Sequence, residues 1–283
     1  KEVMMMNSQE LNKFIKENVD KIYDEMVKIR RKIHMNPELG DEEFETSKLI
    51  KEFLAKNNIE FFEIINTGVV ATIYNDKENM ENKTVATRAD IDALPIFEEN
   101  DVDYKSKNTG KMHACGHDAH TTIQLGVAKV LAENKDKWHG TARFFFQPAE
   151  ETSGGSDRMI KAGALEFEKE KDRKIDAFFA LHMAPEIELG KIGIKYGKAH
   201  ASSARICLTI NGTSAHAALP HKGVDAILIG AKVMEYLQSI VSRRIDPREE
   251  AVITIGAFNG GFADNVVCDK VEMRGTARTM SEE

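Results

Sequence analysis

Hydrophobic side chains recur at helical spacing in the N-terminal part of the chain. Apolar residues fall at steps of three and four between Leu11 and Ile33, a period that predicts a long amphipathic helix. We expect this helix to end within residues 34–37, because proline at position 37 lacks the amide hydrogen that a helix interior requires. A second helix is predicted at residues 45–57, where apolar residues again share one face.

Short apolar runs bounded by polar turns follow and predict strands. They cover residues 69–74, 84–90, 141–147 and 175–181. A helix that begins near Asp118 is expected between the second run and the third. Strands that alternate with helices are typical of an α/β fold, with a central, mostly parallel sheet flanked by helices. Ligands of such a sheet bind beyond the carboxyl ends of its strands.

The pattern changes after Gly197 and predicts a β-α-β-β unit. The strands are expected at residues 204–210, 251–258 and 270–280, and the helix at residues 224–241. A ferredoxin-like α+β domain also needs a second helix and a fourth strand, so we expect this smaller domain to be incomplete in the chain. With 283 residues, two domains are expected, at residues 1–195 and 196–283.

Composition and charge argue against several classes of partner. The chain holds 39 Lys and Arg against 46 Asp and Glu, a net charge of −7, and no long basic run, so we expect no nucleic-acid partner. It shows no apolar run of membrane-spanning length and no signal-peptide pattern, so we expect no membrane partner. Its three cysteines are widely spaced and odd in number, which favours a reducing, cytoplasmic location.

Metal-ligating residue types concentrate in residues 112–120, which hold a thiol, three imidazoles and a carboxylate. In an extended segment the side chains of Cys115 and His117 leave the backbone on the same side, so both can reach one ion or an adjacent pair. Thiolate, imidazole and carboxylate are ligands of zinc and of other late first-row divalent ions. The alternative interpretation is a buried cysteine beside a helix that Asp118 caps.

Two carboxylates stand side by side after the strand predicted at residues 141–147. Neighbouring side chains diverge, so one of Glu150 and Glu151 can bind metal while the other faces a substrate. A metal ion lowers the pKa of bound water, and a free carboxylate nearby can take its proton as the water attacks a carbonyl. Such pairs are otherwise solvated surface features, but this one lies between an apolar strand and Gly154-Gly155.

Four motifs in combination resemble the amidohydrolases of metallopeptidase family twenty. They are RADIDALP at residues 88–95, MHACGHDAH at 112–120, QPAEE at 147–151 and ALH at 180–182. The most similar branch holds aminoacylases, hippurate hydrolases, indole-acetyl-amino-acid hydrolases and N-acetyl-diaminopimelate deacetylases. The resemblance spans nearly the whole chain and implies a zinc-peptidase-like catalytic domain with a smaller lid and dimerisation domain.

The resemblance implies a site for two divalent metal ions, zinc or manganese. The matching ligands are Cys115, His117, Glu151 and His182. The family has one further histidine ligand near its C-terminus. No histidine follows His221 in this chain, so we expect the chain to lack that ligand.

The resemblance also implies catalytic and substrate-binding roles. Glu150 matches the general base, and His216 matches a histidine that polarises the substrate carbonyl, often in the active site of a dimer partner. Asn265 and Arg278 match residues that bind the substrate carboxylate. The alternatives are a surface loop for His216 and an exposed strand position for Arg278. Residues expected to orient the ligands or to be structural are Asp90, Asp92, His113, Asp118 and His120.

The implied reaction is metal-dependent hydrolysis of the amide bond of N-acyl-L-amino acids or similar small conjugates, with Glu150 as general base. The expected partners are this small-molecule substrate and a second copy of the chain, bound through the smaller domain. One alternative is a dipeptidase or carboxypeptidase that acts on small peptides. Another is a catalytically silent fragment or binding protein that lacks the last metal ligand.

Overall fold

A computed structural model of the protein describes residues 7–78, 81–166, 173–198 and 201–281. The chain folds into two compact units, Lys1–Glu186 and Ile187–Glu283. The division into functional domains at residue 195 stays a prediction. No helix among the described residues is long and apolar enough to cross a membrane.

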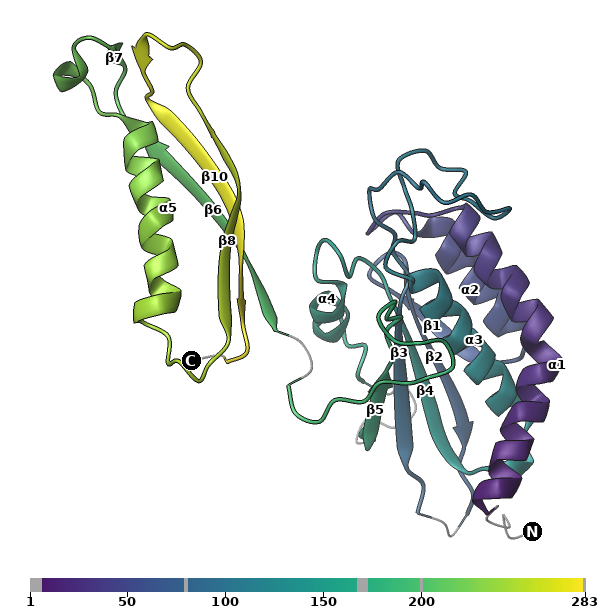
Figure 1. The fold of residues 1–283 in the computed structure, drawn as a ribbon. Coiled ribbons are helices and arrows are strands. Elements are labelled where there is room, and N and C mark those ends of the chain that lie inside the picture. The colour runs from purple at the N-terminus through teal and green to yellow at the C-terminus, as the bar shows by residue number, and fades with distance from the viewer. Residues whose placement is uncertain (1–6, 79–80, 167–172, 199–200, 282–283) are drawn as a thin grey trace. The chain divides into compact units, whose positions relative to one another are not determined.

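A five-stranded sheet forms the centre of the first unit (Figure 1), and its strand order is β1-β2-β4-β3-β5. The β3 strand pairs in parallel with β4 and β5, whereas β2 pairs antiparallel with β1 and β4. The α/β class is confirmed, and the sheet is mixed: four of its five strands run in the same direction, and β2 runs opposite to them. The strands are β1 (Glu60–Ile64), β2 (Gly68–Asn75), β3 (Thr84–Asp90), β4 (Gly140–Gln147) and β5 (Ala177–Ala180).

The β1 strand was not predicted, and its connection to β2 explains why β2 runs opposite to the other strands. A turn of three residues joins β1 to β2, and a connection this short can link only antiparallel neighbours. Ile65 and Asn66 in this turn have positive φ values of 41° and 69°. The sequence of β1 does not alternate cleanly between apolar and polar residues, so its period gave no strand signal.

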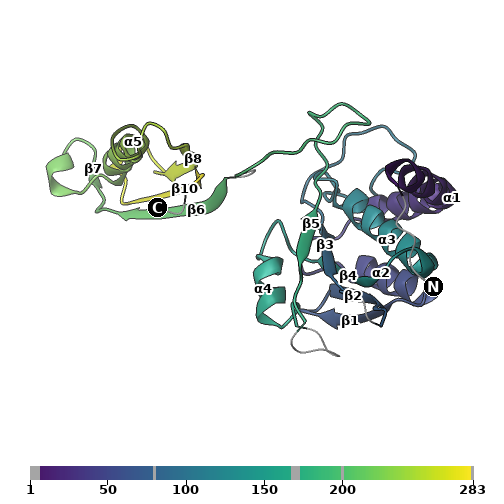
Figure 2. The ribbon, with the colours of Figure 1, turned by 90° about the horizontal axis from the view of Figure 1, so that it is seen from below.

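Helices cover both faces of the sheet. The helices α1 (Ser8–Met35), α2 (Phe44–Lys56) and α3 (His117–Glu133) lie on one face, and the short α4 (Gly155–Lys161) lies on the other (Figure 2). The two faces use alternate residues of β4, because successive side chains of a strand point in opposite directions. Phe144 and Phe146 pack with α2 and α3, and Phe145 packs with Met159 of α4.

The second unit is a three-stranded antiparallel sheet covered by one helix. The strand order is β6-β10-β8, and α5 packs on the sheet through a core that includes Val271 and Met273. Gly230 of α5 permits this approach, because a Cβ there would lie 2.9 Å from the Phe258 ring. The predicted β-α-β-β order is confirmed, and a small two-stranded ribbon of β7 and β9 joins it. The elements are β6 (Ser202–Asn211), β7 (Ala215–His216), α5 (Ala226–Arg243), β8 (Ala251–Gly260), β9 (Val266–Val267) and β10 (Lys270–Thr279).

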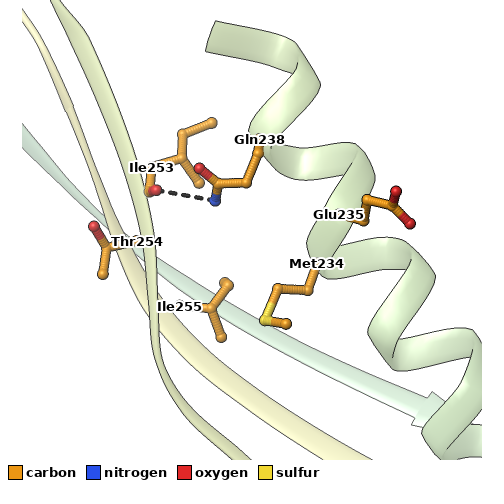
Figure 3. A pocket seen from close by; sticks show the side chains of 6 residues that line it. All are labelled: Met234, Glu235, Gln238, Ile253, Thr254 and Ile255. Atoms are coloured by element: carbon orange, nitrogen blue, oxygen red, sulfur yellow. Dashed lines mark hydrogen bonds between the residues drawn. The ribbon is translucent and has the colours of Figure 1, made fainter. Parts of the chain in front are cut away.

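A groove of about 440 Å³ lies between α5 and β8 (Figure 3). Met234 of α5 and Ile255 of β8 line it with apolar surface. The Gln238 side chain crosses from the helix and donates a hydrogen bond of 3.2 Å to the Ile253 carbonyl oxygen. None of the candidate metal ligands lines this groove.

The packing of α2 on the sheet leads to a stability prediction. Leu54 has no exposed surface and belongs to the core between α2, α3 and the sheet. Replacing Leu54 with Ala should lower the free energy of unfolding of the first unit by about 2–5 kcal/mol, because it removes buried methyl groups and leaves a cavity.

Urea unfolding followed by fluorescence of Trp138, the chain's single tryptophan, reports on this core because Trp138 packs against it. The control is Ile160→Ala on α4, where the side chain is 54% exposed and the change should be within about 0.5 kcal/mol. Equal losses in the two variants would contradict the predicted core.

Candidate metal centre

Three parallel strands bring the chemically active residues to one edge of the sheet. The strands β4, β3 and β5 are neighbours, and Asp90 at the end of β3 lies opposite Gln147 at the end of β4. The Glu150-Glu151 pair follows β4, and His182 follows β5. Helix α3 begins close by, because a hydrogen bond of 3.0 Å from Thr121 Oγ1 to the Asp90 carbonyl oxygen joins it to β3.

Candidate ligand atoms gather around His117. One ring nitrogen of His117, Cys115 Sγ and a ring nitrogen of His182 all lie within 4.8 Å of one another. Oxygens of Glu150 and Glu151 form a second such group with His117. Within these groups Cys115 Sγ lies 3.3 Å from His182 Nε2, and His117 Nε2 lies 3.9 Å from Glu151 Oε1. The structure therefore brings together all four predicted metal ligands and the predicted base.

Hydrogen bonds at the far side of each ring determine which nitrogen faces this group. His117 Nδ1 lies 2.9 Å from the Asp92 carbonyl oxygen and 3.1 Å from Asp92 Oδ1, so it carries the proton. His182 Nδ1 likewise donates to the Met183 carbonyl oxygen at 2.7 Å. In both rings Nε2 then presents a lone pair, which a metal ligand requires.

The surroundings of the buried Nε2 atom of His117 indicate whether a metal ion fits this group of residues. It has no hydrogen-bond partner among the described residues, although buried nitrogens ordinarily have one. It faces a thiol, a second imidazole and carboxylates, the donor types that bind late first-row divalent ions. The residues present therefore fit a divalent metal centre.

His120 belongs to the support of the site. It forms a compact group with Asp90 and His117, but both of its ring nitrogens are engaged. Its Nδ1 donates to Asp90 Oδ1 at 2.6 Å, and its Nε2 accepts a hydrogen bond from the Met183 amide at 2.8 Å. His120 thus links the end of β3 to the segment that carries His182.

Asp90 supplies a buried negative charge beside this group. Burial alone would raise its pKa, but the hydrogen bond from His120 and the charge of Arg88 are among the contacts that lower it to about 2. Arg88 pairs with Asp90 at 2.7 Å, and its Nε donates to Gln147 Oε1 at 2.8 Å. Asp90 is therefore ionised at neutral pH and favours a cation nearby.

The two adjacent glutamates differ in their environment. Glu151 is tied through its backbone, because its amide donates a hydrogen bond of 3.0 Å to Asp92 Oδ2. Burial raises the pKa of Glu150, and the charge of Glu151 raises it further. A carboxylate with a raised pKa is better suited to accept and return a proton near neutral pH.

A buried network that the sequence analysis did not predict anchors the start of α3. His34 Nδ1 lies 2.7 Å from Asp118 Oδ2, and His34 Nε2 lies 3.1 Å from Glu98 Oε1. The hydrogen bond to Asp118 raises the pKa of His34 above its usual value. Arg30 also pairs with Asp118 at 2.7 Å. The partners of His34 are 64 and 84 residues away in the chain, so no local pattern in the sequence predicts these contacts.

His113 is buried in the first unit, whereas the remaining predicted catalytic and substrate-binding residues lie in the second unit. His216 on β7 accepts a hydrogen bond from the Ala218 amide at 3.1 Å. The Asn265 carbonyl oxygen accepts one from Ala217 at 2.9 Å, so His216 and Asn265 lie on the same ribbon. Arg278 lies instead near the C-terminal end of β10, opposite Ser203 of β6. The roles of His216, Asn265 and Arg278 stay predictions.

The state of the Cys115 thiol predicts that metal binding releases a proton. Burial and the neighbouring Glu151 raise the pKa of Cys115 to about 12, so the thiol is protonated before metal arrives. Zinc binds the thiolate, so zinc should release about one proton more from the wild type than from Cys115→Ser. Because protons compete with zinc for this sulfur, affinity should fall as pH falls.

Zinc titration in weak buffer with a pH indicator measures this difference. Cys207→Ser provides a control, because it removes an exposed thiol from the second unit. It should release as many protons as the wild type. Equal proton release by Cys115→Ser and Cys207→Ser would show that Cys115 is not a ligand.

A known protein family matches the part of the chain that contains the four predicted metal ligands. A family model described as "Peptidase family M20/M25/M40" matches residues 86–279. The chain is 42% identical over 267 residues to an N-acetyl-L-cysteine deacetylase of Bacillus subtilis, covering 94% of this chain and 62% of that protein. It is 40% identical over 270 residues to an N-acyl-L-amino acid amidohydrolase of Geobacillus stearothermophilus, covering 95% and 70%.

The fold is also shared with a solved structure from Bacillus subtilis. That protein is described as a dinuclear metal-binding peptidase of the M20 family, and it is 34% identical to this chain. The match has a TM-score of 0.73 and covers 93% of this chain and 66% of the other. This chain thus spans about two thirds of the length of these three proteins.

Proposed function

The chain belongs to peptidase family M20/M25/M40, and on that premise we propose that the protein hydrolyses the amide bond of N-acyl-L-amino acids or similar small amino-acid conjugates. The observation that carries this proposal is the cluster around His117, in which a free imidazole nitrogen faces a thiol and two adjacent glutamates. The similarity to a deacetylase of N-acetyl-L-cysteine and to an N-acyl-L-amino acid amidohydrolase supports the substrate class.

Cys115, His117, Glu151 and His182 would hold two divalent metal ions. The donor set of one sulfur, two imidazoles and a carboxylate suits zinc, and the carboxylate oxygens also suit manganese. When bound, such ions polarise a carbonyl and lower the pKa of water. The dinuclear centre named for the Bacillus subtilis peptidase supports the count of two.

Glu150 would act as the general base and then as the general acid. Its carboxylate takes a proton from the water that attacks the substrate carbonyl carbon, and it later gives a proton to the amide nitrogen as the C–N bond breaks. The products are a carboxylate and an amino acid. The raised pKa of Glu150 suits both transfers, and the hydrogen bonds that Asp92 accepts from His117 and from the Glu151 amide hold these two residues in place.

Residues of the second unit would bind the substrate. His216 would polarise the carbonyl oxygen, while Asn265 and Arg278 would hold the substrate carboxylate, for which an arginine side chain offers paired donors. We further propose that the protein forms a homodimer through its second unit and works in the cytoplasm. The ribbon that carries both His216 and Asn265 supports a joint role for these two residues.

Glu150→Gln tests the assignment of the base. The variant should retain its metal, because Glu150 is not a proposed ligand, while kcat should fall by about 100- to 10,000-fold, since the amide cannot accept the proton. Metal content by atomic absorption and hydrolysis of an N-acetyl amino acid are the measurements. Glu151→Gln is the matched comparison and should lose metal as well as activity. Near-normal turnover by Glu150→Gln would rule out this role.

Substrate choice separates the proposed activity from its alternatives. We expect kcat/KM to be higher for N-acetyl or N-benzoyl amino acids than for dipeptides of the same amino acid. A preference for dipeptides would instead identify a peptidase. Metal content and hydrolysis by the 283-residue chain itself test the alternative of a silent fragment, which predicts neither stoichiometric binding of two ions nor turnover.

A further inference from the structure

A fully buried carboxyl group lies beneath the loop that carries the two active-site glutamates. Glu43 immediately precedes α2 and has no exposed surface. Its Oε1 accepts a hydrogen bond of 2.8 Å from the Ala149 amide, and its Oε2 accepts one of 2.7 Å from Thr67 Oγ1. Glu43 is 106 residues from Ala149 in the chain, yet it holds the residue directly before Glu150.

Ala149 adopts a backbone conformation that requires support. Its φ is +51°, a left-handed value that alanine seldom adopts. It is completely buried, so its amide needs a partner within the protein. Glu43 supplies the acceptor for the amide, and Gly155 donates its own amide to the Ala149 carbonyl oxygen at 3.2 Å.

The loop after β4 is closely packed, which leaves little room for another backbone conformation. A Cβ at Gly155 would overlap the Pro148 carbonyl oxygen, and a Cβ at Gly40 would overlap Thr152 Oγ1. The segment before Glu43 therefore rests against the loop after β4. Glu150 thus lies between two residues whose amides are held by buried carboxyl groups. Glu43 holds the amide of Ala149, and Asp92 holds the amide of Glu151.

We propose that Glu43 is a positioning residue that sets the directions of Glu150 and Glu151 by holding the Ala149 amide. The expected effect of Glu43 on catalysis rests on the proposed function. The expected effect on metal binding concerns only the position of Glu151. An apolar side chain of the same size would avoid the cost of burying a carboxyl group, but it would leave the Ala149 N–H buried without an acceptor. The left-handed turn would then lose the bond that holds its amide.

Three variants separate positioning from general stability. Glu43→Met fills the space but removes the acceptor. Glu43→Gln keeps an amide oxygen that can accept from Ala149 and an NH₂ group that can donate to Thr67. Thr67→Val is the matched control, because it breaks the other bond of the same buried carboxyl group and leaves the bond to Ala149 intact.

Titration with Co²⁺ reads the geometry of the site without turnover. The affinity and the cobalt–thiolate absorption band are measured in the 283-residue chain, with thermal unfolding followed in parallel. Glu43→Met should bind Co²⁺ about 10-fold more weakly than the wild type, the loss typical of disturbed support for a metal ligand. Glu43→Gln should bind close to wild type. Thr67→Val should unfold at a lower temperature yet also bind close to wild type.

The kinetic measurement uses an N-acetyl amino acid as substrate. Glu43→Met should lower kcat by about 10- to 100-fold with little change in KM, because the base and the ligand are displaced while the substrate contacts remain. Glu43→Gln should restore most of this loss. A purely structural role would give Glu43→Met and Thr67→Val the same kcat at a temperature where both are folded.

Two results would overturn the inference. One is equal Co²⁺ affinity in Glu43→Met and Thr67→Val, and the other is a Glu43→Gln variant as impaired as Glu43→Met. If Glu43→Met does not fold, Glu43→Asp takes its place, since it draws the carboxylate back by one methylene group and should also weaken Co²⁺ binding. Wild-type affinity in Glu43→Asp would then overturn the inference. An inactive wild-type enzyme would refute the proposed hydrolase but leave the Co²⁺ comparison intact.

Discussion

The candidate metal centre depends on the parallel pairing of β3 with β4 and β5. Parallel neighbours place their carboxyl ends at the same edge of a sheet, so three segments distant in the chain deliver their polar residues to one place. Asp90 and Asp92 leave β3, the glutamate pair leaves β4, and His182 leaves β5. The antiparallel edge of β1 and β2 contributes none of the candidate ligands, but Ile64 of β1 and Val70 of β2 form part of the core that contains Met159 of α4.

Buried carboxyl groups form the framework behind the donor atoms. Asp92 orients His117 and holds the Glu151 backbone, Asp90 orients His120, and Asp118 anchors α3 through His34. Burying a carboxylate without a partner costs free energy. Hydrogen bonds in the low-dielectric interior offset this cost. The bonds to Asp92 and Asp90 also fix the tautomers of His117 and His120, and in His117 this leaves Nε2 with a lone pair that can bind a metal ion.

Much of the secondary structure was predictable because its signal is local. The apolar periods of α1, α2 and α5 and the buried runs of β2, β3 and β4 were all predicted from spacing. The short α4 and the strand β1 were missed, since a few residues without a clean period give no local signal. The antiparallel edge was missed for a different reason, because the direction of a strand follows from the length of the turns that join it.

The sequence by itself determined the chemical identity of the site. The density of thiol, imidazole and carboxylate groups within 112–120 and the glutamate pair behind a buried strand identify the candidate ligands without coordinates. Only the tertiary structure decided that His117 keeps a free nitrogen, that both His120 nitrogens are engaged and that Glu43 reaches Ala149. These are contacts between residues 25 to 106 positions apart, or depend on them, and local spacing cannot encode which distant groups the folded chain brings within hydrogen-bond distance.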